Sequence, residues 1–263
     1  MTPAELQERE AMSRLSRVNG PFEVRAVALA LATQPGTDAA LAAWASESAD
    51  TSSADTLLDA VRHVSDAARL PVLEIMLARL RLQPKPERRV LLHSARRVMA
   101  THTPMRPLDR LHWLLMRRRL GDKAPAAASP VSQNDVSQLP PATLLQVARV
   151  TAYLSRMVPG RDAAAAQRWY TEAMRHFLPA EMVPACHSPD GEVFAQALEE
   201  VEALPWMLRP VLLRAWVDAA IATSERARLP MAAADALRLV ADLIESPMPP
   251  DLERHYVELD WTC

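Results

Sequence analysis

Apolar residues return every three or four positions along most of this chain, which is the spacing of one face of an α-helix. The clearest run lies near the C-terminus, where the apolar positions are Leu208, Val211, Leu212, Ala215, Trp216, Ala219 and Ala220. A second run follows Pro230, with Ala233, Leu237, Val240, Ala241 and Ile244, and the prolines of Ser246–Pro250 end it. We therefore predict an αα-hairpin over residues 204–250. Pro205 should lie in the first turn of its first helix, and the two apolar faces should pack together.

Prolines, glycines and short polar stretches divide the rest of the chain into further helical segments. The predicted helices cover residues 2–18, 22–33, 37–48, 54–67, 70–82, 87–101, 107–120, 140–158, 161–177 and 191–204. A break near Arg69 separates the fourth helix from the fifth. Residues 121–138 are small, polar and without periodicity, as in linkers. We predict an all-α protein of about eleven helices, in two bundle-like halves built from αα-hairpins. The halves are residues 1–120 and 139–263, joined by the linker 121–138.

Two parts of the sequence match each other in register, which suggests an internal duplication. The stretch Arg88–His93 (RRVLLH) matches Arg209–Arg214 (RPVLLR), and both continue through an apolar helix to Ala-Thr. A polar turn, a proline (Pro107 or Pro230) and a leucine-rich helix then follow in each. We predict a duplicated hairpin. The alternative is coincidence between two helices rich in alanine and leucine.

The composition agrees with a helical protein that does not enter a membrane. Of 263 residues, 49% are hydrophobic and only five are glycine, and the formal net charge is −2. No apolar run approaches the roughly 20 residues that span a bilayer, and the acidic N-terminus does not resemble a signal peptide. Two cysteines are too few for a disulfide framework. We expect a cytosolic location, with the inner face of the membrane as an alternative.

The sequence carries no catalytic signature. There is no HExxH motif, catalytic triad pattern, P-loop or GxGxxG among its residues. Cys186 and His187 stand near Asp190, but no second spaced ligand pair accompanies them, so we expect no metal and no cofactor. His102 and His112 flank a turn and could respond to pH; the favoured alternative is that they are ordinary, partly exposed histidines. We predict a non-enzymatic protein; the alternative is a hydrolase whose site is assembled from dispersed residues.

Charge is distributed unevenly along the chain. Residues 69–123 hold 14 Arg and Lys against 4 Asp and Glu, a net of +10, and residues 190–263 hold 6 against 14, a net of −8. We predict a basic interaction face made of Arg96, Arg97, Arg106, Arg110, Arg117, Arg118 and Arg119. Its partner could be an unknown protein, the acidic C-terminal half of the same chain or of another copy, or an anionic membrane or polyanion surface. Nucleic acid is disfavoured because Trp113 lies among leucines. The alternative is an ordinary solvated helix face.

The hairpin pattern resembles TerB-like helical modules. More specifically, residues 67–75 (AARLPVLEI) and 231–250 resemble the cytosolic helical region that follows the peptidase domain in HtpX-like membrane zinc metallopeptidases of proteobacteria. The acidic Ala-Asp-Gly turn of such modules is replaced here by residues 101–105 and 223–227. The resemblance implies a non-catalytic helical region that acts through protein–protein or regulatory contacts in a metallopeptidase system.

Overall fold

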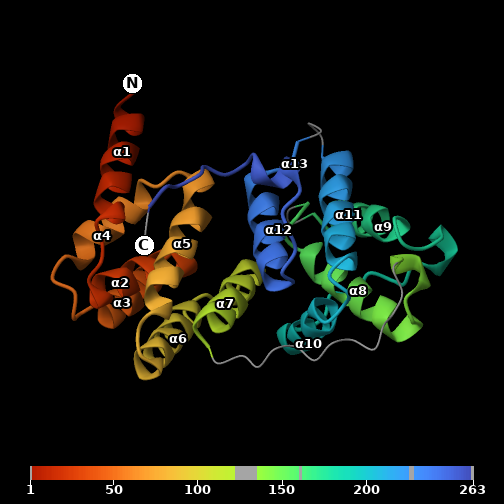
Figure 1. Ribbon diagram of the computed structural model, residues 1–263, viewed down its shortest axis with the longest axis horizontal. Helices are drawn as coiled ribbons and strands as arrows, with labels where there is room; N and C mark the ends of the chain where they lie inside the picture. The colour runs from red at the N-terminus through yellow and green to blue at the C-terminus, as the bar shows by residue number, and fades with distance from the viewer. Residues whose placement is uncertain (1, 122–134, 160–161, 225–227, 262–263) are drawn as a thin grey trace. The chain divides into compact units, whose positions relative to one another are not determined.

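The computed structural model describes residues 2–121, 135–159, 162–224 and 228–261. In these ranges it contains thirteen α-helices, two short 3₁₀-helices and no strand, so the predicted all-α class is confirmed (Figure 1). Contacts between Cα atoms divide the chain into two compact units, which are described separately. Unit 1 comprises residues 1–123 and 256–263, and unit 2 comprises residues 124–255. None of the described helices is both long enough and apolar enough to cross a membrane.

Unit 1 is built around its second helix. Its elements are α1 (Pro3–Ser16), α2 (Pro21–Thr33), α3 (Asp38–Glu47), α4 (Ala54–Arg62), α5 (Asp66–Arg81), α6 (Lys85–Met99) and α7 (Pro107–Leu120). Helix α2 contacts α3, α4, α5, α6 and α7, and nine of its thirteen residues are buried. Because other helices cover α2 on several sides, its sequence is apolar almost all round and not on one face only.

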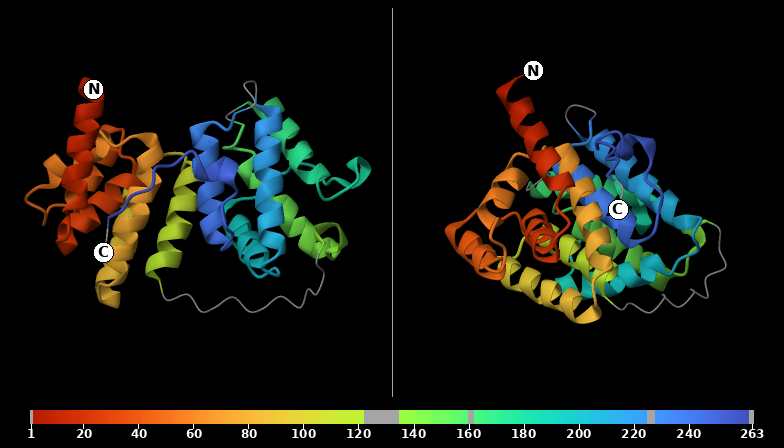
Figure 2. Two further views of the ribbon diagram at one scale, coloured as in Figure 1. Left: turned by 45° about the horizontal axis from the view of Figure 1, so that its top comes forward. Right: turned by 60° about the vertical axis from the view of Figure 1, so that its left-hand side comes forward.

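Unit 2 contains the predicted hairpin. Its elements are η1 (Val136–Gln138), α8 (Pro141–Leu154), α9 (Ala163–Arg175), η2 (Ala180–Met182), α10 (Gly191–Glu202), α11 (Leu208–Thr223), α12 (Met231–Leu243) and α13 (Pro250–Glu253) (Figures 1 and 2). Helix α11 does contact α12, but its more extensive contact is with α9. Trp216 of α11 is fully buried and forms hydrogen bonds with both α8 and α9. Its Nε1 donates to Thr151 Oγ1 of α8 at 3.0 Å, and its backbone carbonyl accepts from Trp169 Nε1 of α9 at 3.3 Å.

Three local predictions were wrong. The break between the fourth and fifth helices lies at residues 63–65 and not near Arg69, because Ser65 is extended and Asp66 begins the next helix. Helix α11 begins at Leu208, so Pro205 lies in the preceding turn. Val211, predicted in the buried stripe, is 50% exposed. Of the predicted linker, residues 122–134 lie outside the described residues, and Val136 near its end is buried in η1.

The two units share an order of helices. Helices α2, α3, α5, α6 and α7 correspond to α8, α9, α10, α11 and α12. The pairs α2–α3, α2–α5, α3–α6 and α6–α7 are in contact, as are their counterparts α8–α9, α8–α10, α9–α11 and α11–α12. A fully buried tryptophan is the seventh residue of both α3 (Trp44) and α9 (Trp169). Helices α1, α4 and α13 have no counterpart. These four pairs agree with a duplicated module, whereas the contacts α2–α6, α2–α7 and α5–α7 of unit 1 are more extensive than their counterparts in unit 2. The duplication stays a prediction.

Candidate functional site

The seven arginines of the predicted basic face lie on or next to α6 and α7, but several are bound within unit 1. Arg106 Nη2 donates to Asp109 Oδ1 at 2.6 Å and to the carbonyl of Thr33 at 2.7 Å. Arg97 pairs through Nε and Nη2 with both carboxylate oxygens of Glu47, which lowers the pKa of Glu47 to about 2. Arg96 lies over the ring of Trp113, 5.1 Å from its centroid.

The remaining four of these arginines lie along α7. Arg117 and Arg119 are exposed, whereas Arg110 and Arg118 are half-buried. Because consecutive residues of a helix point about 100° apart, residues 117–119 cannot share one direction. The structure therefore distributes the predicted basic residues over different faces, and a working basic face stays a prediction.

Other arginines hold the C-terminal ends of helices. Arg79 donates to the carbonyl of Ser16, the last residue of α1, and to the carbonyl of Val18 just beyond it. Arg88 donates to the carbonyl of Leu120 at the end of α7, at 3.1 Å. The last carbonyls of a helix have no partner within it and carry partial negative charge, so a guanidinium is well placed there. Part of the +10 charge of residues 69–123 is thus structural, which charge counting along the sequence could not reveal.

Unit 2 repeats this device at the matching position. Arg209, which aligns with Arg88 in the predicted duplication, donates to the carbonyl of Ile244 after α12 at 3.1 Å and to Leu204 at 3.0 Å. In both units, an arginine near the start of one helix of the pair holds the end of the other. The sequence match aligns these two arginines, but it does not reveal that they hold helix ends.

A buried polar cluster joins α6 to α7. Asp109 is 1% exposed, and its Oδ2 lies 2.8 Å from Nδ1 of His102 and accepts from the backbone N–H of Arg106 at 3.2 Å. His112, one turn along α7, is completely buried, and this burial lowers its pKa to about 4. The carboxylate is thus occupied in holding the turn between the two helices. His112 is neutral at physiological pH, because water cannot hydrate the charged imidazolium form at this buried position.

The cysteine site of unit 2 is not an activated nucleophile. Cys186 Sγ lies 3.7 Å from Ser155 Oγ, and burial raises the pKa of this thiol. Burial, with a smaller effect of the cysteine, also raises the pKa of Tyr170 to about 12. Asp190, the third member of the group considered from the sequence, caps α10 by accepting from the N–H groups of its first turn. Within the described residues, no three or more His, Cys, Asp or Glu are grouped to hold a metal ion.

An apolar group at the start of α11 is exposed, and we call it the Trp206 patch. It consists of Trp206, Met207 and Val211, whose exposed fractions are 74%, 52% and 50%. The helix begins at Leu208 and buries Leu212 and Trp216, so positions 207 and 211 face outward. Sequence periodicity missed the patch, because the apolar residues cover more than one face of this helix.

Three glutamates precede the Trp206 patch in the sequence. Residues 199–211 contain Glu199, Glu200 and Glu202 against the single base Arg209. Glu199 and Glu200 are exposed on the last turn of α10, whereas Glu202 is buried. Arg209 is occupied by the carbonyls of Leu204 and Ile244.

Comparison of the chain with protein-family models, with curated proteins and with solved structures finds no match.

Proposed function

We propose that this chain is a non-enzymatic helical protein–protein interaction module, and that the Trp206 patch is its contact surface. The observation that carries the proposal is the 74% exposure of Trp206 beside the exposed Met207 and Val211. Tryptophan and methionine are enriched in protein interfaces, and buried tryptophans dominate their binding energy. A partner that fits would present an apolar pocket for these side chains.

The resemblance to the helical region of membrane zinc metallopeptidases suggests which partner to test first. We propose a regulatory contact with such a peptidase, made by this chain as the non-catalytic component.

Site-specific photo-crosslinking in cells tests the proposal. A benzophenone amino acid replaces Trp206 in one variant and Met182 in a control variant. Met182 is also well exposed, at 62%, but lies apart in the chain on the short helix η2. We expect one discrete adduct from position 206, identified by mass spectrometry, and none from position 182.

A second variant tests whether the patch itself makes the contact. With the crosslinker at position 206, Met207→Ser and Val211→Ser should remove the adduct, because they take away the apolar area next to it. Equal crosslinking from positions 206 and 182, or an adduct that survives both serine changes, would contradict the proposal. If the adduct forms with a peptidase of the expected class, the family context is supported as well.

A further inference from the structure

A proline inside helix α5 leaves one backbone carbonyl without a helical partner. Pro71 is the sixth residue of α5 and has no N–H. In a regular helix that N–H would donate to the carbonyl four residues earlier, which belongs to Ala67. A carbonyl that loses its helical donor in this way requires another partner.

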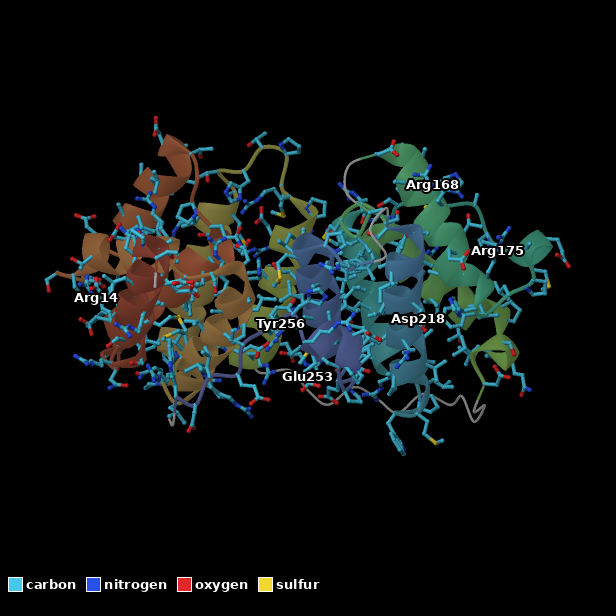
Figure 3. The ribbon with its side chains drawn as sticks, turned by 90° about the horizontal axis from the view of Figure 1, so that it is seen from above. Arg14, Arg168, Arg175, Asp218, Glu253 and Tyr256 are labelled. Carbon is cyan, nitrogen blue, oxygen red and sulfur yellow. The ribbon has the colours of Figure 1, made fainter. Side chains whose placement is uncertain are left out.

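The partner is the C-terminal segment of the chain. The backbone N–H of Val257 donates to the carbonyl of Ala67 at 3.3 Å. Residues 256–261 belong to unit 1 and have no helical structure. In Figures 1 and 2 this dark blue end of the chain passes α5, and Tyr256, its first residue, is labelled in Figure 3.

The side chains of this segment differ in their exposure. Tyr256, Leu259 and Trp261 are half-buried, whereas Val257, Glu258 and Asp260 are exposed. The segment is thus held by one backbone hydrogen bond and by three large, half-buried side chains. Sites that bind extended peptides use the same combination of backbone hydrogen bonds and side-chain pockets. Because Val257, Glu258 and Asp260 face solvent and the segment has no helical hydrogen bonds, its opening should require far less free energy than unfolding of unit 1.

We propose that unit 1 carries a docking site for an extended peptide at the carbonyl freed by Pro71, and that residues 256–261 occupy it as a displaceable segment. The ligand class is an extended segment with a free backbone N–H at the position of Val257, large apolar residues around it and acidic residues facing solvent. The C-terminal segment of a second copy meets these requirements. This site is distinct from the Trp206 patch and does not depend on the function proposed for that patch.

Hydrogen exchange on the full chain tests the docking in cis. In the unmodified protein, the amide of Val257 should exchange more slowly than those of Glu258 and Asp260. Val257→Pro removes the backbone N–H donor. Val257→Ala keeps this N–H and shortens a side chain that is already 43% exposed, so it is the matched control. We expect fast exchange throughout residues 256–261 in the proline variant and unchanged protection in the alanine variant. An unprotected Val257 amide in the unmodified protein would overturn the proposal without any variant.

Binding in trans provides the second test. A fluorescent peptide of residues 251–263 is titrated onto the full-length Val257→Pro chain, whose own segment is released, and onto the unmodified chain. We expect clear binding to the first and much weaker binding to the second, whose site is occupied. A peptide with an ester in place of the Tyr256–Val257 amide has an oxygen where the N–H donor was and should bind about 2- to 10-fold more weakly. No binding to the proline variant, or equal binding of amide and ester peptides, would refute the site.

Discussion

Replacement of Trp216 by alanine should destabilise unit 2 strongly. The side chain is 0% exposed, and its Nε1 donates to Thr151 Oγ1 at 3.0 Å. Truncation of a buried tryptophan to alanine costs about 3–5 kcal/mol, because the apolar contacts are lost and a cavity is left. About 1 kcal/mol of this is the net value of the hydrogen bond. For a unit of this size, such a change lowers the midpoint of thermal unfolding by roughly 10 °C or more.

Unit 2 also supplies a matched control. Trp206 is 74% exposed, so Trp206→Ala should change the free energy of unfolding by less than about 0.5 kcal/mol. Trp216→Phe, which keeps an aromatic ring but loses the indole N–H, should fall between the two alanine variants. The contrast therefore separates burial of the indole from the loss of any tryptophan.

Urea unfolding followed by far-UV circular dichroism measures these differences. The two units need not unfold in one transition, so hydrogen exchange should assign the shifted transition to unit 2. Protection of unit 1 amides, for example in α2, should change little. Equal destabilisation by Trp216→Ala and Trp206→Ala would refute the packing described for α8, α9 and α11.

Three further predictions concern polar groups. Because the pKa of His112 is lowered to about 4 from 6.5, the folded state binds fewer protons than the unfolded state between these values. Unfolding free energy should therefore fall by up to about 3 kcal/mol as pH drops from 6.5 to 4, and His112→Leu should abolish this loss in urea titrations at each pH. Glu47→Gln should cost about 1–2 kcal/mol at pH 7, and its difference from the unmodified protein should vanish as pH falls from about 4.5 towards 2, since the pKa of Glu47 is lowered to about 2. Arg209→Met should lower the free energy of unfolding by about 1.5–3 kcal/mol, because the carbonyls of Leu204 and Ile244 lose a charged donor. Arg214→Met, which removes a surface pair with Asp218, should lower it by under about 1 kcal/mol. Urea unfolding of both variants measures the difference, and equal losses would contradict the capping role.

Local chemistry determined most of the helix positions. The predicted helix 107–120 agrees with α7 at both ends, because a proline favours the first turn and the apolar period runs without interruption to Leu120. The same reasoning placed Ala233, Leu237, Val240, Ala241 and Ile244 in the core of unit 2, where all five are buried. These properties depend on neighbours within one or two turns, so the amino-acid sequence alone contains the required information.

Only the tertiary structure decided which groups meet over long distances. Arg88 and Leu120 are 32 residues apart, and no local pattern distinguishes an arginine that holds a helix end from one that faces solvent. The outward turn of Val211 depends on how α11 packs against α9 and α8. The meeting of Val257 with the carbonyl freed by Pro71 depends on the path of the C-terminal segment. Helix formation satisfies the backbone locally, whereas charges, exposed apolar residues and freed carbonyls find their partners only when the packed units bring distant segments together.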